Sequence, residues 1–134
     1  MLEILISVVE DDASVRQALG RLVRSLGFTV VGFASAEEFL RFGSLCDTSC
    51  LILDVHLPEM SGLQLQGHLA AAGYHIPIIF ITAYPDERAR ARALEAGAVD
   101  FLPKPFGDEA LLSGIRSALN FGDVDGTPGD YRVA

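Results

Sequence analysis

Several side chains that could do chemistry stand directly after apolar runs whose patterns predict buried strands. They are Glu10 and Asp11 after one run, Asp54 and Thr82 after two others, and Lys104 just past a fourth. In a parallel sheet the carboxyl ends of the strands share one edge, and ligands bind there. We therefore expect these side chains to meet in one pocket, although each alone could be a helix cap or a solvated surface residue.

The three acids of this set would repel one another in such a pocket. Two unit charges about 4 Å apart cost roughly 4 kcal/mol at an effective dielectric constant of 20, so a compensating cation is needed. Carboxylate oxygens favour a hard ion such as Mg²⁺, which keeps several waters. Asp12, the next acid, is interpreted instead as the N-cap of the first helix.

A carboxylate, a hydroxyl and a lysine beside Mg²⁺ would make a site for phosphoryl transfer. The carboxylate of Asp54 could attack phosphorus and form an aspartyl phosphate. The metal ion and Lys104 would neutralise charge on the phosphoryl oxygens, one of which Thr82 could hydrogen-bond. Pro103 and Pro105 flank the lysine and fix the backbone around it.

The elements that would position these side chains alternate along the chain. Apolar runs predict strands at residues 4–9, 28–33, 51–54, 76–82 and 98–102. Apolar residues at helical spacing predict helices at about 15–26, 36–40, 62–72, 86–96 and 111–119, with a capping box from Ser35 to Glu38 before the second. This alternation predicts an α/β fold: a flavodoxin-like (βα)5, doubly wound, five-stranded parallel sheet with strand order 2-1-3-4-5.

Length, charge and hydropathy narrow the classes of function. The 134 residues suit one domain, and the net charge of −8 argues against direct binding of nucleic acid by this chain. No apolar run reaches the roughly 18–20 residues of a membrane span, and the N-terminal residues lack the features of a signal peptide. We expect a cytoplasmic protein, without a membrane partner, in which Cys46 and Cys50 are free thiols.

Four short segments together resemble the receiver domain of two-component response regulators, the CheY-like family. They are Val9-Glu10-Asp11-Asp12, Leu53-Asp54 with the turn Pro58-Glu59-Met60-Ser61-Gly62-Leu63, Ile81-Thr82-Ala83, and Phe101-Leu102-Pro103-Lys104-Pro105-Phe106. Each segment alone is a weak signal, whereas the four in this order and spacing are specific. The resemblance covers residues 4–120.

The resemblance implies a role for each matching residue of the pocket. Asp54 resembles the phosphorylated aspartate, and Lys104, whose bond to Pro105 is cis in the family, resembles the lysine that grips the phosphoryl group. Glu10 and Asp11 resemble the acidic pair. The implied ligands of Mg²⁺ are drawn from Glu10, Asp11, Asp54 and the backbone carbonyl of His56.

Further residues are implied in switching and in kinetics. Thr82 resembles the switch hydroxyl, and Phe101 resembles the aromatic residue that turns inward when that hydroxyl moves to the phosphate. His56 and Tyr84 stand at positions where family side chains control access of the attacking water. Because both are large, we expect a slowly decaying phosphoryl group.

The expected function is that of a phosphoryl-accepting signalling switch rather than a conventional enzyme, because the chain would catalyse only its own phosphorylation and dephosphorylation. A histidine kinase or phosphotransfer protein would donate the group. The signal would pass to the surface of the fourth helix, fifth strand and fifth helix, through which the chain could also form a homodimer.

We expect a receiver domain at residues 1–121 and a flexible tail or linker at 122–134. A stand-alone receiver is favoured over a fragment of a longer, DNA-binding transcription factor.

Three other classes fit the sequence less well. A flavin-binding protein of the same fold needs a hydroxyl-rich and glycine-rich loop after the first strand, where this chain has three acids. A phosphatase of the Asp-x-Asp type needs a second aspartate at the position of His56. A receiver that only scaffolds would not need Asp11, Asp54, Thr82 and Lys104 together.

Overall fold

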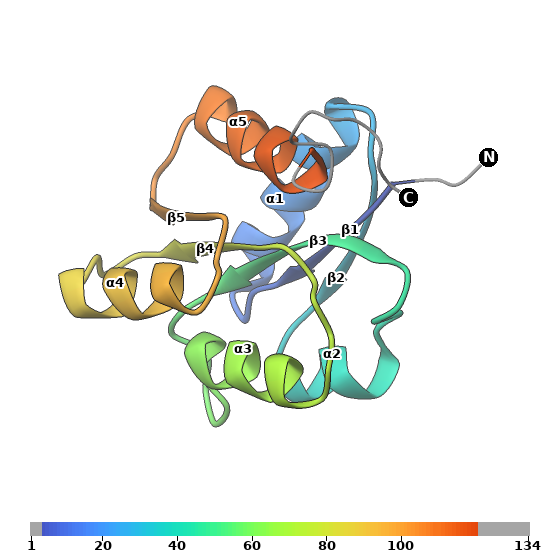
Figure 1. Cartoon of the computed structure of the whole chain (residues 1–134). Coiled ribbons are helices and arrows are strands. Elements are labelled where there is room, and N and C mark those ends of the chain that lie inside the picture. The colour runs from blue at the N-terminus through green and yellow to red at the C-terminus, as the bar shows by residue number, and fades with distance from the viewer. Residues whose placement is uncertain (1–3, 121–134) are drawn as a thin grey trace.

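Strands and helices alternate through the whole part of the chain that the computed structural model describes, residues 4–120 (Figure 1). The strands are β1 (Leu5–Val9), β2 (Thr29–Phe33), β3 (Thr48–Asp54), β4 (Ile78–Thr82) and β5 (Asp100–Pro103). The helices are α1 (Ala13–Ser25), α2 (Ala36–Phe42), α3 (Gly62–Ala71), α4 (Glu87–Glu95) and α5 (Asp108–Leu119). The predicted tail at 122–134 lies outside the described residues.

The strands form one parallel sheet in the order β2-β1-β3-β4-β5, so the predicted fold class is confirmed. Helices α1 and α5 cover one face of the sheet, and α2, α3 and α4 cover the other (Figure 1). The central strand β3 contributes side chains to both layers of the core. Leu51 and Leu53 pack on the side of α2, α3 and α4, and Cys50 and Ile52 pack on the side of α1 and α5. Burial on both faces explains why β3 is a continuous apolar run.

The helix boundaries follow local capping chemistry. The side chain of Asp12 accepts a hydrogen bond from Val15 N–H at 3.1 Å, which confirms it as the cap of α1. The predicted capping box before α2 forms only in part, because Glu38 accepts from Ala34 N–H instead of returning to the cap residue Ser35. Helices α1, α3 and α4 are each followed by a glycine with positive φ: Gly27, Gly73 and Gly97.

Strands β1 and β2 each begin one residue later than predicted, and β4 begins two residues later, at Ile78. For β3 and β5 the hydrogen bonds explain the difference. Strand β3 begins at Thr48, earlier than the apolar run, because the hydroxyls of Thr48 and Ser7 pair at 2.8 Å and satisfy each other in the core. Strand β5 begins at Asp100, later than predicted, because Ala98 N–H bonds the carbonyl of Ala93 and closes the end of α4.

Two further expectations concern membranes and thiols. Within residues 4–120, no helix is both long and apolar enough to cross a bilayer. Cys46 is exposed and Cys50 is buried, and neither is in a disulfide, as predicted. Burial raises the pKa of the Cys50 thiol to about 12, so Cys50 stays protonated and unreactive at neutral pH.

Candidate functional site

The carboxyl edge of the sheet brings together the acids and the lysine that the sequence singled out. Glu10, Asp11 and Asp54 each offer an oxygen, and these oxygens all lie within 4.8 Å of one another. The Nζ of Lys104 donates to Glu10 at 2.6 Å and to Asp54 at 3.4 Å. Residues from the segment after β1, the end of β3 and the segment after β5 therefore meet at one point, although they are far apart in sequence.

Backbone pairing between neighbouring strands delivers Lys104 to this point. Thr82 and Pro103 are partners in the β4–β5 register, and the next amide, Lys104 N–H, donates to the Thr82 carbonyl at 2.7 Å. The Lys104–Pro105 peptide bond is cis, as the resemblance implied. The lysine side chain thus leaves the sheet beside the end of β4 and reaches across to the carboxylates.

Burial and charge set the protonation of the cluster. Glu10 is 1% exposed and Asp54 is 4% exposed, whereas Asp11 is exposed. Burial, with the charge of Asp54 in support, raises the pKa of Glu10 above its ordinary value, although hydrogen bonds from Lys104 and the Asp12 amide oppose the shift. Burial alone would lower the pKa of Lys104, but its hydrogen bond to Glu10 and the charges of Asp54 and Glu10 outweigh burial and raise it. Lys104 is therefore a cation at neutral pH.

The turn after Asp54 is shaped by close backbone contacts. His56 N–H donates to the Asp54 carboxylate at 3.1 Å and holds it toward the edge of the sheet. A side chain at Gly62 would place its Cβ only 2.3 Å from the carbonyl oxygen of Asp54, so this position requires glycine. Glu59 has a φ of 64°, and Met60 N–H donates to the side chain of Glu37 on α2 at 3.2 Å. The loop between β3 and α3 is therefore held at several points.

Thr82 ends the strand next to Asp54, and Phe101 lies one strand further along the sheet; within residues 4–120, neither side chain is hydrogen-bonded to the cluster. Thr82 is completely buried, and its hydroxyl accepts a hydrogen bond from Tyr84 N–H at 3.0 Å. Among the described residues, no hydrogen bond joins Thr82 to the three carboxylates or to the side chain of Lys104. Phe101 is 7% exposed and packs inside against Phe80, with ring centroids 6.2 Å apart.

His56 and Tyr84 contact each other beside the site. Their rings meet edge to face with centroids 5.6 Å apart, and Tyr84 is 72% exposed. The two residues follow the ends of β3 and β4, so the pair stands next to Asp54 and Thr82. Their effect on the lifetime of a phosphoryl group stays a prediction.

The sequence reasoning missed one residue that bonds the acidic turn. Arg16 on α1 donates from Nη1 to the backbone carbonyl of Glu10 at 2.8 Å, whereas the apolar spacing that predicts a helix at 15–26 assigns no contact to this arginine. Periodicity reports which face a residue occupies and not which backbone atom a long side chain reaches. An arginine one turn and a half beyond the acids was the available signal.

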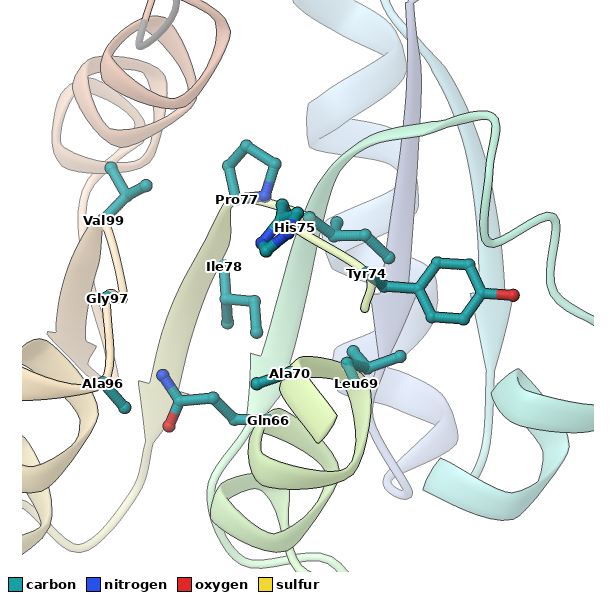
Figure 2. Close-up of a pocket in the computed structure, with 11 residues that line it drawn as sticks. Gln66, Leu69, Ala70, Tyr74, His75, Pro77, Ile78, Ala96, Gly97 and Val99 are labelled. Atoms are coloured by element: carbon teal, nitrogen blue, oxygen red, sulfur yellow. The ribbon is translucent and has the colours of Figure 1, made fainter. Parts of the chain in front are cut away.

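A different pocket, of about 240 Å³, lies between α3, the start of β4 and the end of α4 (Figure 2). Gln66, Leu69, Tyr74, Pro77 and Val99 are among its lining residues, and no acidic residue lines it. Gln66 is buried and donates to the Ala93 carbonyl at 3.1 Å. In the described part of the chain, the acidic edge is the one place where three or more possible metal-ligating side chains converge.

The donor atoms at the acidic edge fit Mg²⁺. All three are carboxylate oxygens, which are hard ligands. They lie within 4.8 Å of one another, near the roughly 4.2 Å that separates opposite ligands of one Mg²⁺. Repulsion among them is offset in part by Lys104, and a divalent cation would offset the rest.

Comparison with known proteins gives a consistent result. The family model described as "Response regulator receiver domain" matches residues 6–116. The chain is 51% identical over 114 residues to nodulation protein W of Bradyrhizobium diazoefficiens, with 85% of this chain and 50% of that protein covered. It is 36% identical over 118 residues to transcriptional regulatory protein FixJ of Rhizobium meliloti, with 88% and 58% covered. The chain spans about half the length of the curated relatives it matches.

Solved structures resemble the fold closely. The response regulator StyR superposes with a TM-score of 0.83 at 45% identity, covering 89% of this chain and 60% of that chain. The structure described as FixJ-N superposes with a TM-score of 0.80 at 35% identity, covering 90% of this chain and 96% of that chain.

Proposed function

This chain belongs to the response regulator receiver domain family, and on that premise we propose that Asp54 accepts a phosphoryl group in a two-component signalling pathway. Receiver domains are signalling switches rather than conventional enzymes. The observation that carries the proposal is the convergence of three carboxylate oxygens within 4.8 Å, with Lys104 bonded to two of the carboxylates. That set is suited to hold a cation and a phosphoryl group together.

The proposed reaction moves a phosphoryl group from a donor to the side chain of Asp54. An oxygen of Asp54 attacks phosphorus, the bond from phosphorus to the donor nitrogen breaks, and an aspartyl phosphate forms. Mg²⁺ bound by Glu10, Asp11, Asp54 and the carbonyl of His56 would neutralise negative charge on the phosphoryl oxygens. Lys104, now paired with the carboxylates, would pair with a phosphoryl oxygen. Burial of Asp54 strengthens each of these interactions.

The same site would pass the signal to the surface. When the Thr82 hydroxyl turns to a phosphoryl oxygen, it no longer accepts from Tyr84 N–H, so the loop before α4 is released. Phe101 would be the next residue to respond, since it lies on the neighbouring strand β5 and its ring packs against Phe80 of β4. We propose that α4, β5 and α5 carry the resulting change to a partner or to a second copy of the chain.

The donor we propose is a histidine kinase or a phosphotransfer protein. An apolar groove of about 460 Å³ beside Lys104 supports a protein donor, since Leu19, Leu22 and Phe106 line it next to the charged site. A protein that docks there would present its phosphoryl group close to Asp54. We place the protein in the cytoplasm, because the free thiols Cys46 and Cys50 suit a reducing compartment.

The whole protein's output stays a separate proposal. We propose a receiver unit at residues 1–121 and a tail or linker at 122–134. The leading interpretation is a receiver that acts through protein contacts. The alternative is a receiver portion of a longer transcriptional regulator that binds DNA. It is supported by relatives named as transcriptional regulatory proteins, of which this chain covers 58–60%.

Labelling with a small phosphodonor tests the proposed function. The chain is incubated with acetyl phosphate and Mg²⁺, and the mass gain of one phosphoryl group is measured on intact protein. Asp54→Asn should abolish the gain, and chelation of Mg²⁺ should abolish it in the parent. Asp86→Asn is the matched control, because Asp86 caps α4 away from the cluster and asparagine caps equally well. Labelling that survives in Asp54→Asn overturns the proposal.

A further inference from the structure

Hydrogen bonds from three directions hold the turn that carries the acidic pair. Glu10 N–H donates to the Phe33 carbonyl on β2 at 3.0 Å. The Glu10 side chain accepts from Asp12 N–H at 3.0 Å. The Glu10 carbonyl accepts from the guanidinium of Arg16 at 2.8 Å, a bond that ties the turn to α1.

The bond from Arg16 acts on the position of Asp11. A peptide unit is planar, so fixing the Glu10 carbonyl oxygen also fixes the plane that contains the nitrogen and Cα of Asp11. The Asp11 side chain is exposed and makes no hydrogen bond or ion pair within the described residues. Its carboxylate therefore depends on its own backbone for its place in the cluster of Glu10, Asp11 and Asp54.

Arg16 can reach the turn because β2 leaves room for its aliphatic stem. An added Cβ at Gly32 would lie 3.1 Å from Cγ and 3.2 Å from Cδ of Arg16, closer than ordinary contact. Alanine at this position would force the stem to move by a few tenths of an ångström and would strain the bond that its guanidinium makes. Gly32 is exposed on the edge strand, so a methyl group there meets the arginine rather than the core.

We propose that Arg16, seated over Gly32, is a positioning residue for the Mg²⁺ site: it fixes the peptide that carries Asp11. The inference rests on the proposed function, in which the acidic cluster binds Mg²⁺. As a positioning residue, Arg16 would raise the affinity for Mg²⁺. Its positive charge alone would lower that affinity, because a cation near the cluster repels Mg²⁺. Loss of Arg16 should therefore weaken Mg²⁺ binding if it positions the turn, and strengthen binding if only its charge matters.

The test is the dissociation constant for Mg²⁺, measured from amide NMR shifts of the folded chain without any phosphodonor. Arg16→Ala should weaken binding about 10-fold, the low end for loss of a group that orients a metal ligand. Arg21→Ala removes the same charge from an exposed position of α1 and should leave affinity unchanged or slightly tighter. Gly32→Ala should weaken binding in the parent and have no further effect in Arg16→Ala.

The outcomes separate this inference from the proposed function. If the parent chain shows no Mg²⁺ binding, the proposed function itself fails. If the parent binds and Arg16→Ala binds equally well or more tightly, Arg16 does not position the site. The inference would also be overturned if Gly32→Ala weakened Mg²⁺ binding by the same factor in the parent and in Arg16→Ala. Urea unfolding in chelator confirms that each variant is folded.

Discussion

Replacing Asp11 by asparagine should stabilise the protein without metal and destabilise it with metal. Asp11→Asn keeps the shape of the side chain and removes one of three charges whose oxygens lie within 4.8 Å of one another. No hydrogen bond within the described residues is lost, because the Asp11 carboxylate makes none there. The variant therefore isolates the electrostatic cost of the cluster.

The magnitude follows from Coulomb's law. At 4.8 Å, a pair of unit charges repels by about 3.5 kcal/mol at an effective dielectric constant of 20 and by about 0.9 kcal/mol in bulk water. Asp11 is exposed, so its repulsion from Glu10 and Asp54 lies near the lower figure for each pair. Attraction to Lys104 offsets part of the sum. We expect Asp11→Asn to raise the free energy of unfolding by about 1 kcal/mol in chelator.

With Mg²⁺ bound, the parent should be more stable than Asp11→Asn. At a Mg²⁺ concentration of 100 times its dissociation constant, the parent gains about 2.7 kcal/mol, whereas a variant without one ligand gains little. Urea unfolding in low salt, with chelator or with Mg²⁺, measures both states. Asp12→Asn is the control, since Asp12 caps α1 outside the cluster and should change neither value. The reasoning is refuted if Asp11→Asn lowers stability in chelator, or if the control moves as much as the variant.

Four other outcomes are expected. A His56→Ala, Tyr84→Ala double variant should lose its phosphoryl group faster than the parent, because the paired rings no longer restrict water, and an unchanged half-life refutes this role. Gly62→Ala should lower the free energy of unfolding by about 2 kcal/mol or more in urea, because its Cβ would meet a backbone oxygen at 2.3 Å. Cys50, with its pKa raised to about 12 by burial, should resist alkylation at pH 8 until the chain is unfolded. Since the folded state keeps the Cys50 proton, this group's contribution to stability should fall as pH rises from 9 toward 12.

Much of the fold could be predicted because it depends on local patterns. Burial on both faces makes β3 and β4 continuous apolar runs, and their polar ends mark where the strands emerge. The alternation of strands and helices then limits the topology, and parallel strands send Asp54, Thr82 and the segment before Lys104 to one edge. The meeting of the acids and the lysine thus follows from the hydrophobic periodicity, the order of strands and helices along the chain, and the right-handed crossovers between parallel strands.

The features that escaped prediction depend on contacts between distant segments. Strand β3 extends back to Thr48 because the Thr48 hydroxyl forms a hydrogen bond with the hydroxyl of Ser7 on β1. Gln66 is buried in α3 because the carbonyl of Ala93 in α4 accepts its amide proton. The reach of Arg16 to the acidic turn depends on empty space at Gly32. The spacing of apolar residues within one strand or helix does not predict such pairings.

On the proposed signalling route, the packing of α4 would let a movement of the Thr82 hydroxyl reach this helix before the others. The buried residues of α4 are Ala89 and Ala93, whereas α5 buries the larger Leu111 and Ile115. Burying a leucine or isoleucine side chain contributes about 1.5–3 kcal/mol, and alanine contributes much less. The loop that precedes α4 is bonded to the Thr82 hydroxyl, so movement of that hydroxyl acts on the helix that the core holds most weakly.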